Sequence, residues 1–382
     1  MSELEQAVKR LGKELGFDLV RITSLQPFFR DEDAALQRIR QGLMDGMPWF
    51  SEERVRKAAH PEILMPDARS IIVLAMSYYT REDEEDALPG SRGRIARYAW
   101  GDDYHKVMKE RLHLFVGRLS ETLDHPVKAR IFVDDGPMLE RAVAERAGLG
   151  WFGKNTMILT PTHGSWIFLG EVITDLVLEP DKPLLKNCGQ CTQCIDKCPT
   201  GAIIAPYVID APRCISYLTI EHRGPIPRHL RPLVGDWVFG CDICQEVCPV
   251  NRRAEKGHEK AFTKRSGFGV LDLISILGMS DEDFRDRFHN SPIKRAKRVG
   301  LQRNACVALG NIGNPIAVPA LTDALKEGDS LVRGHAAWAL GRIATWEALL
   351  ALELALAREE DQEVREELVF ALETTAASAR SG

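Results

Sequence analysis

The sequence predicts a multi-domain α+β chain with an N-terminal α/β domain, a small cysteine-rich domain and a C-terminal all-α domain of repeats. Strand-like and helix-like segments alternate upstream, eight of the nine cysteines fall between residues 188 and 248, and related helical segments recur downstream. With 382 residues the chain is long enough for two or three domains, each with its own core. We place the domains at residues 1–180, 181–260 and 261–382.

The N-terminal domain is expected to combine amphipathic helices with buried strands. Apolar residues from Leu4 to Leu15 recur at helical spacing in "MSELEQAVKRLGKELG", and charged residues occupy the other face. The runs "SIIVLAMSY" from Ser70 and "KARIFVDDG" from Lys128 are typical of strands. Between them, "DYHKVMKERLHLFVGRLSETL" from Asp103 is typical of an amphipathic helix.

Charge and hydropathy restrict the classes of protein. The formal net charge of -5 argues against a protein that coats nucleic acid by bulk charge, so a polyanionic partner would need a local basic patch. The first residues have the pattern of neither a signal peptide nor a transit peptide, and the apolar run from Ser70 is about half as long as a membrane crossing requires. We therefore expect a cytoplasmic protein with no membrane association.

The cysteine spacing predicts iron–sulfur clusters, because a reducing cytoplasm disfavours disulfides. Residues 188–199 read C-x2-C-x2-C-x3-C-P, the pattern of bacterial two-cluster ferredoxins. A permuted half keeps C-x2-C-x3-C-P at 241–249, and its remaining ligand is Cys214, well upstream. In such domains the cysteine before proline ligates the neighbouring cluster. We therefore expect one 4Fe–4S cluster on Cys188, Cys191, Cys194 and Cys248, and a second on Cys198, Cys214, Cys241 and Cys244.

Two structural zinc knuckles are the alternative use of this array. Zinc sites use pairs of C-x2-C separated by a longer loop, and the triple found here suits one tetrahedral ion poorly. Two clusters in one small domain lie close enough to pass single electrons at strongly reducing potentials. The domain is therefore predicted to conduct low-potential electrons. Cys306, in a helical segment away from the array, is expected to be a small buried apolar residue.

The C-terminal domain is predicted to contain HEAT-like or armadillo-like repeats. "NACVALGNI" from Asn304 is related to "HAAWALGRI" from His335, and "VRGHAAWAL" from Val332 to "VREELVFAL" from Val364, with offsets of 31 and 32 residues. Only two to three units are present, so they form a short appendage. The basic run before them is by itself more typical of a solvated helix face than of a nucleic-acid site; it comprises Lys294, Arg295, Lys297, Arg298 and Arg303.

The segment "GLGWFG" at residues 148–153 fits the dinucleotide-binding pattern G-x-G-x-x-G but lacks its context. It follows "MLERAVAERA", a strong helix-forming segment that Gly148 would end. A dinucleotide-binding loop has to follow a strand and begin a helix, so we reject this reading.

Three stretches together carry a resemblance to a known family: "LERAVAERAGLGWFGKN" at 139–155, the cysteine array, and "QRNACVALG" at 302–310 before the repeats. The chain resembles bacterial epoxyqueuosine reductases over essentially its whole length, closest to members with a C-terminal HEAT-like extension. The resemblance implies an oxidoreductase that reduces epoxyqueuosine to queuosine at the wobble position of the tRNA anticodon. It also implies that residues 1–180 bind cobalamin, which receives electrons from the clusters. The D-x-H-x-x-G signature of other cobalamin proteins is absent.

The resemblance implies a proton donor as well. The V-D-x-G motif of the family is Val133 to Gly136 here, which makes Asp134 the candidate acid. Opening an epoxide develops an alkoxide, and its removal as water requires protons from a group whose pKa burial has raised. From the residues alone, "VDDG" is more typical of a turn at the end of a strand.

Cofactor and tRNA contacts follow from the same resemblance. For the basic residue ahead of "HPEILMP", Lys57 fits best and Arg56 is a rival. The implied cobalamin contacts are Lys57, Ala96 through its backbone, Asp134, Asn155, Ile158, Leu169, Ser216 and Asp242. The implied tRNA contacts are Arg223, Lys294, Arg295, Lys297 and Arg298. An anticodon loop offers unpaired bases at small energetic cost.

Two other functions account for part of the sequence. A ferredoxin-type electron-transfer protein would explain the cysteines but leaves the upstream domain and the repeats without a role. A related cobalamin-dependent reductive dehalogenase would share the cofactor domain and paired clusters, but such enzymes are typically exported with a twin-arginine signal, which is absent here. For the reductase we expect a monomer and an external electron donor such as a flavodoxin or ferredoxin.

Overall fold

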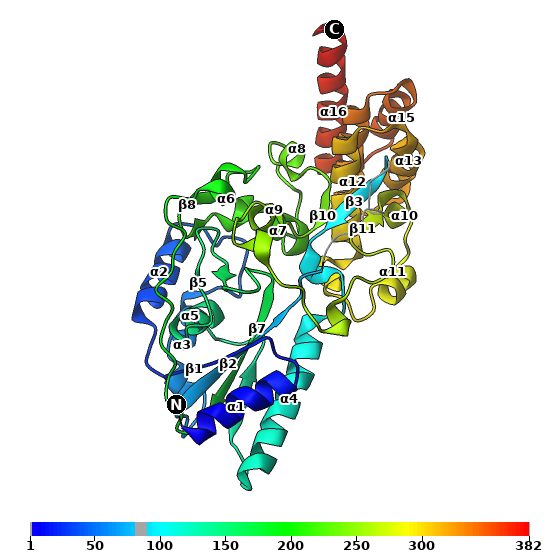
Figure 1. Cartoon of the computed structure of the whole chain (residues 1–382). Helices are drawn as coiled ribbons and strands as arrows, with labels where there is room; N and C mark the ends of the chain where they lie inside the picture. The colour runs from blue at the N-terminus through cyan, green and yellow to red at the C-terminus, as the bar shows by residue number, and fades with distance from the viewer. Residues whose placement is uncertain (1, 81–89, 382) are drawn as a thin grey trace. The chain divides into compact units, whose positions relative to one another are not determined.

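The computed structural model describes residues 2–80 and 90–381, with side chains through residue 375 (Figure 1). Close contacts divide the chain into two compact units, each assembled from three separate stretches. Unit 1 comprises Met1–Arg81, Gly101–Pro212 and Asp242–Thr263, and unit 2 comprises Glu82–Trp100, Arg213–Cys241 and Lys264–Gly382. These units are spatial divisions, whereas the three consecutive sequence domains stay predictions. The predicted combination of mixed α/β structure with a helical C-terminal region is confirmed.

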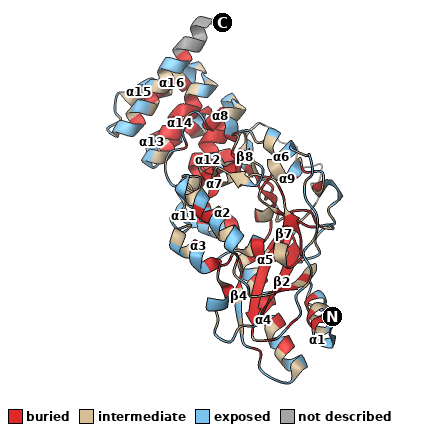
Figure 2. Ribbon diagram, turned by 90° about the vertical axis from the view of Figure 1, so that its left-hand side faces the viewer, coloured by how far each residue is buried: buried red, intermediate tan, exposed pale blue. Residues whose placement is uncertain are grey.

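Unit 1 is built on a four-stranded antiparallel sheet in the order β1-β2-β7-β4. The two central strands are almost entirely buried, because their sequences are nearly continuous apolar runs (Figure 2). The strands predicted from Ser70 and Lys128 are therefore confirmed as β2 and β4. The strand bounds are β1 Leu19–Thr23, β2 Ser70–Ser77, β4 Ala129–Phe132 and β7 Ile167–Thr174.

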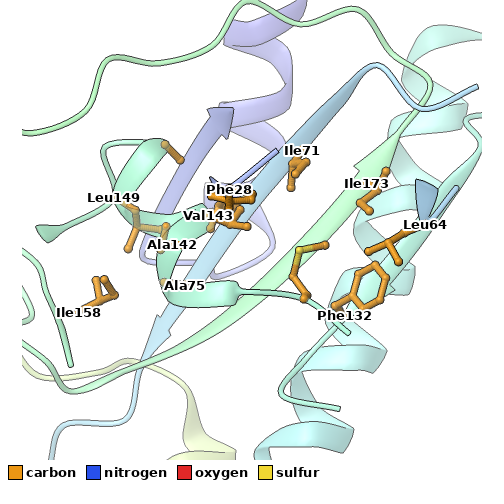
Figure 3. Close-up of a cluster of buried hydrophobic side chains, with 14 of the residues drawn as sticks. Phe28, Leu64, Ile71, Ala75, Phe132, Ala142, Val143, Leu149, Ile158 and Ile173 are labelled. Carbon is orange, nitrogen blue, oxygen red and sulfur yellow. The ribbon is translucent and has the colours of Figure 1, made fainter. Parts of the chain in front are cut away.

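Two helices cover opposite faces of this sheet. The long helix α4 begins after Asp103, whose side chain caps it, and its apolar face lies against Gly170 of β7. The short helix α5 packs on the other face, where a cluster of buried side chains fills the space beneath it (Figure 3). Gly148 follows α5 with φ +69, so the predicted helix stop is confirmed. The larger helices of unit 1 are α1 Glu3–Glu14, α2 Phe29–Arg40, α3 Glu52–Ala58, α4 Tyr104–Leu123 and α5 Glu140–Arg146.

Short elements complete unit 1 around the cysteine segments. A small antiparallel hairpin follows α5 directly, and one-turn helices lie within each cysteine segment. Their bounds are β5 Trp151–Phe152, β6 Ile158–Leu159, α6 Gln193–Asp196, β8 Ile203–Ala205, β9 Val208–Ile209 and α9 Ile243–Glu246.

Unit 2 joins a three-stranded sheet to antiparallel helix pairs. Strand β3 lies between β10, which is parallel to it, and β11, which is antiparallel. The strands are β3 Arg92–Ile95, β10 Trp237–Phe239 and β11 Val270–Asp272. The helices are α7 Ile215–Ile220, α8 Arg231–Val234, α10 Leu273–Leu277, α11 Asp281–Arg287, α12 Lys297–Ile312, α13 Val318–Glu327, α14 Ser330–Ile343, α15 Trp346–Leu356 and α16 Gln362–Ser381.

The repeat period seen in the sequence reflects close packing between alternate helices, α12 against α14 and α14 against α16. Gly310 on α12 and Gly341 on α14 occupy equivalent repeat positions. A Cβ on Gly310 would lie 2.9 Å from the Cα of Ala339, and one on Gly341 would lie 3.1 Å from the Cα of Ala371. Each glycine therefore permits a backbone approach that a larger residue would prevent.

Buried polar side chains fix unit 2 internally. Asn304 is fully buried and donates from Nδ2 to the carbonyls of Thr219 and Val238, at 2.8 and 2.9 Å. Arg231, 1% exposed, forms a two-pronged ion pair with Glu367, each contact 2.8 Å long. No helix in the described part of the chain combines the length and apolar character needed to cross a lipid bilayer.

The substitution Glu367→Ala should destabilise unit 2 strongly. It leaves the Arg231 guanidinium buried without its carboxylate, and breaking a buried ion pair in this way costs about 3–5 kcal/mol. Denaturant unfolding followed by circular dichroism measures the effect. As a control, Glu121→Ala removes a surface carboxylate that is 70% exposed and 3.6 Å from Arg118, and should change stability little. Equal losses in the two variants would contradict the assignment.

Candidate functional site

The two cysteine segments of unit 1 meet through their one-turn helices, since α6 packs against α9. Each segment bends in a tight turn: the backbone N–H of Cys191 donates to the carbonyl of Cys188 at 3.1 Å, and that of Cys248 donates to the carbonyl of Gln245, also at 3.1 Å. The short C-x2-C spacing therefore turns successive thiols toward a common side, and the α6–α9 contact brings the second segment to them.

Four thiols of unit 1 lie close enough to influence one another. Cys188 and Cys248 pack into one apolar cluster with Trp151 and Leu159. Loss of water and the nearby thiols of Cys188 and Cys248 raise the pKa of Cys194 to about 11. Loss of water and the thiols of Cys188 and Cys191 raise the pKa of Cys248. The structure thus gathers the predicted ligands of the first cluster.

The donor chemistry of this group fits an iron–sulfur cluster. Thiols that raise each other's pKa are poor places for free negative charge, whereas iron binding replaces their protons and neutralises them. Among the described residues, no group of three or more His, Cys, Asp or Glu side chains converges on a point that could hold a single metal ion.

The predicted ligands of the second cluster divide between the two units. Cys198 and Cys244 belong to unit 1, and Cys214 and Cys241 belong to unit 2. Cys306 lies fully buried on α12, so its expected role as a small core residue is confirmed.

The β5–β6 hairpin holds both cysteine segments of unit 1. Lys154 Nζ donates to the carbonyl of Gly189 at 2.8 Å, next to the first cysteine. Asn155 Nδ2 donates to the carbonyl of Cys244 at 3.2 Å, in the second segment. Because the hairpin follows α5 with only a short turn between them, the sheet that carries α5 also positions the cysteines.

The candidate acid Asp134 lies in the turn after β4. Its φ of +51 is a left-handed turn conformation, which agrees with the turn reading of "VDDG". The Tyr104 hydroxyl donates to Asp134 Oδ2, and His105 Nε2 lies 3.9 Å from the same oxygen. The Tyr104 ring is stacked between His105 and Phe168, with centroid distances of 4.1 and 4.3 Å. The phenol is thereby fixed toward the carboxylate.

The expected burial of Asp134 is not found. Its side chain is 59% exposed, in the turn that follows the edge strand β4. The neighbouring Asp135 forms an ion pair with Lys109 on α4. This ion pair ties the second carboxylate of the turn to α4. Asp134 is thus an accessible carboxylate held by a tyrosine.

Two glutamates near this turn have raised pKa values: Glu140, which is half-buried, and Glu171, which is fully buried. Glu140 begins α5 and accepts a hydrogen bond from the backbone N–H of Asp134. Loss of water, followed by the carboxylates of Asp134 and Asp135, raises the pKa of Glu140 to about 8. Glu171, in the middle of β7, is fully buried, and neither of its oxygens has a hydrogen-bond partner in the described structure. Burial first, and then Glu140 and Asp134, raise its pKa well above the usual range.

These residues were missed by the sequence analysis. Glu171 pairs with Phe132 of β4 and Val73 of β2, so it lies on the sheet face that α5 covers. The sequence did contain a sign of an unusual buried carboxylate, because Glu171 is the one charged residue in the apolar strand "IFLGEVIT". Tyr104 and Glu140 gave no comparable signal, since charged and aromatic residues are ordinary at helix starts.

The implied cobalamin contacts are spread over both units. In unit 1, Asn155 and Ile158 are buried in the hairpin, Asp242 is buried ahead of α9, and Leu169 is the single β7 residue that is only half-buried. Ala96 and Ser216 belong to unit 2. The Ala96 N–H already donates to the Phe239 carbonyl at 2.8 Å, so only its carbonyl oxygen can accept a further contact.

The two rivals for the basic contact near residue 57 differ in their surroundings. Arg56 pairs with Glu52 at 3.1 Å and with Glu32 at 3.5 Å. Lys57 is exposed, and no ion pair is recorded for it within the described residues. This difference favours Lys57 as the side chain that is available to a ligand.

The basic run of unit 2 separates into surface and structural residues. Lys294, Arg295 and Lys297 are exposed, as is Arg223, whose Nη1 lies 3.3 Å from the carbonyl of Ala296 within the run. Arg295 contacts Glu221, and Arg298 pairs with Asp281 at 2.6 Å. Arg303 is different: it is 1% exposed and donates to three backbone carbonyls, so its place in the predicted run is a structural one.

Gathered thiols on an antiparallel α/β sheet, together with helical repeats, define an iron–sulfur oxidoreductase with an appended HEAT-like region. A family model for a 4Fe–4S double cluster binding domain matches residues 187–251, and one for HEAT repeats matches residues 294–373. A third, described as Epoxyqueuosine reductase QueG, DUF1730, matches residues 59–135. The chain belongs to the epoxyqueuosine reductase family.

Curated relatives and solved structures agree with this assignment. Epoxyqueuosine reductase from Xanthomonas campestris is 40% identical over 339 residues, covering 88% of this chain and 95% of the relative. The Bacillus subtilis enzyme is 35% identical over 380 residues, covering 98% and 97%. A crystal structure of epoxyqueuosine reductase with an epoxyqueuosine-modified tRNA-Tyr stem loop aligns with a TM-score of 0.91 and 34% identity, covering 98% of this chain and 99% of that one.

A further solved structure of a relative differs in the position of one loop. It is the Bacillus subtilis enzyme with an aspartate-bearing catalytic loop swung out of the active site. That structure has a TM-score of 0.89 and 33% identity, and covers 97% of this chain and 99% of that chain.

Replacing Glu171 by glutamine should make stability less dependent on pH. The folded state keeps a proton on this carboxyl that the unfolded chain releases above its ordinary pKa, so the wild type loses stability as pH rises from about 4.5 through the raised folded value. Glutamine stays neutral, so the midpoint of denaturant unfolding should fall less between pH 6 and pH 9. Glu121→Gln, at an exposed position, serves as the control. An unaltered pH slope for Glu171→Gln would show that this carboxyl is not held neutral.

Proposed function

We infer that this chain reduces epoxyqueuosine to queuosine at the wobble position of the tRNA anticodon. The observation that carries the inference is identity of 35–41% to curated epoxyqueuosine reductases over most of the chain. It is supported by the structural likeness to a relative solved with an epoxyqueuosine-modified stem loop. Anaerobic reconstitution with iron, sulfide and cobalamin, followed by an assay on tRNA carrying epoxyqueuosine, tests the function directly.

The cofactors are two 4Fe–4S clusters and cobalamin. When bound, the clusters supply electrons singly and cobalamin supplies a reducible cobalt. For the first cluster the proposed ligands are Cys188, Cys191, Cys194 and Cys248, supported by their gathering in unit 1. For the second they are Cys198, Cys214, Cys241 and Cys244, supported by their spacing and by the double-cluster match over residues 187–251.

The side chains available near β7 fit a large, largely apolar ring with polar edges. Leu169 leaves an accessible apolar surface on a strand that is otherwise buried. The proposed cobalamin contacts are Lys57, Ala96 through its carbonyl, Asp134, Asn155, Ile158, Leu169, Ser216 and Asp242. The contacts of Asn155 and Asp242 are supported by the hydrogen bond of Asn155 to the carbonyl of Cys244, two residues after Asp242.

The turn that carries Asp134 is proposed to supply a proton to the reaction. Reduction of an epoxide to an alkene consumes two electrons and two protons and releases the oxygen as water. Asp134 is proposed to hold the proton given to that oxygen, and Tyr104, which donates to Oδ2, orients the carboxyl. Glu140 holds the backbone N–H of Asp134 and so fixes the turn. The accessible position of Asp134 is compatible with a loop that moves, as described for the Bacillus subtilis relative.

The tRNA-binding surface is proposed to include Arg223, Lys294, Arg295, Lys297 and Arg298. Arg295 and Arg298 are partly neutralised by acidic neighbours, so Lys294 and Lys297 supply most of the uncompensated charge. Such charges contact phosphates and give affinity that depends on salt. The proposal also includes a monomer in the cytoplasm and a flavodoxin or ferredoxin as donor, because low-potential clusters need a reducing compartment and a one-electron partner.

Substitution of Asp134 by asparagine should abolish most turnover while the cofactors stay bound. Loss of a general acid costs about 10²- to 10⁴-fold in rate. The assay is conversion of epoxyqueuosine to queuosine in tRNA, with iron, cobalt and the absorption spectrum measured on the same sample. Asp135→Asn, one residue away and ion-paired to Lys109, is the matched control and should keep more activity. Full activity in the Asp134 variant would remove the acid from the mechanism.

Neutralising the basic run should weaken tRNA binding and its salt dependence. In Lys294→Ala/Lys297→Ala, the slope of log affinity against log salt should fall by about one for each lysine, because fewer counterions are released. Adding Arg295→Ala and Arg298→Ala should have a smaller further effect. Binding is measured by fluorescence anisotropy of a labelled stem loop at several salt concentrations. A double variant at Lys106 and Lys128, two exposed lysines of unit 1, is the control; an equal effect there would argue against a specific surface.

A further inference from the structure

The indole of Trp151 is a buried hydrogen-bond donor without an acceptor. Its side chain is 6% exposed, and its Nε1 has no partner within the described structure. An unsatisfied buried donor destabilises the folded state, and buried tryptophan N–H groups usually find a partner. Its backbone lies at the start of β5, where it pairs with Leu159.

The surroundings of Trp151 point to sulfur as the acceptor. The ring packs in one cluster with Cys188 and Cys248, one from each cysteine segment of unit 1. The remaining members of this cluster, Leu159, Leu184 and Val250, have apolar side chains that offer no acceptor. Lys186, two residues before Cys188, places its ammonium 5.4 Å from the ring centroid. The Trp151 ring therefore packs with the side chains of Cys188 and Cys248, and the Lys186 ammonium lies over the same ring.

We propose that the indole N–H of Trp151 donates a hydrogen bond to a sulfur of the cluster held by Cys188, Cys191, Cys194 and Cys248, and thereby raises that cluster's reduction potential. The proposal rests on the ligand set given under the proposed function. Reduction adds one negative charge to the cluster, and a donor to sulfur stabilises that charge more than it stabilises the oxidised form. Trp151 thus acts through the cluster, by adjusting its reduction potential, and not by contact with the substrate.

The hairpin explains why this residue is placed to act on the cluster. Lys154 and Asn155 in its turn hold the Gly189 and Cys244 carbonyls, at 2.8 and 3.2 Å, while Trp151 and Leu159 pack on the cysteines themselves. Four contacts from one short element thus fix its geometry against both segments. A donor on such an element keeps its direction when the cluster is reduced, which is what a stable shift in potential requires.

Redox titration of the reconstituted holoenzyme tests the proposal. Trp151→Phe keeps an aromatic ring but removes the N–H, so one of the two cluster midpoint potentials should become more negative while the other stays unchanged. Trp346→Phe makes the same chemical change at a side chain that is 72% exposed on α15 and should alter neither potential. An unchanged pair of potentials in the Trp151 variant, with iron content intact, would overturn the proposal.

A second measurement requires no substitution and separates hydrogen bonding from altered packing. Protein grown with tryptophan labelled by ¹⁵N at the indole nitrogen should show a ¹⁵N coupling to the reduced, paramagnetic cluster in pulsed electron paramagnetic resonance. The coupling should persist in Trp346→Phe and disappear in Trp151→Phe. If the Trp151 variant loses its iron, the labelled wild type decides alone, and absence of the coupling refutes the donor. A wild type that takes up no iron would instead refute the proposed cluster ligands.

Discussion

The gathering of thiols from two distant segments is the constraint on which unit 1 depends. Thiols placed together raise one another's pKa, so the thiols alone gain no stability from their mutual electrostatics. The β5–β6 hairpin and the α6–α9 contact hold the segments in place with backbone hydrogen bonds and apolar packing. Iron then converts this unfavourable arrangement into a stable one, because it replaces protons with metal–sulfur bonds.

The antiparallel sheet connects this array to the proton chemistry. Strand β4 ends in the Asp134 turn, α5 follows that turn, and the hairpin follows α5. A short stretch of chain therefore carries the candidate acid, the Glu140 contact and the residues that hold the cysteines. Beneath α5 the buried Glu171 adds a neutral carboxyl to the same face of the sheet. Loss of water and the neighbouring carboxylates raise the pKa of Glu140 to about 8 and that of Glu171 well above its usual range, whereas the side chain of Asp134 is 59% exposed.

Unit 2 uses polar side chains in two separate ways. Arg303, Asn304 and Arg231 are buried, and their hydrogen bonds to carbonyls or to Glu367 fix the packing of the helices. The exposed lysines of the same stretch, Lys294 in the turn before α12 and Lys297 at its first position, form no ion pair in the described structure. Residues of one basic stretch of sequence thus divide into structural and surface roles according to whether the fold buries them.

The sequence by itself determined the elements and the donor atoms. Apolar runs and helical periods predicted β2, β4 and α4, because those patterns reflect burial of one face or of a whole strand. Cysteine spacing predicted the clusters, since a ligand motif is local. Only the tertiary structure decided which side chains lose water: Asp134 is exposed, Glu171 is buried without a partner, and Arg303 is internal. Solvent exposure and electrostatic coupling depend on residues that are distant along the chain, so no local pattern contains them.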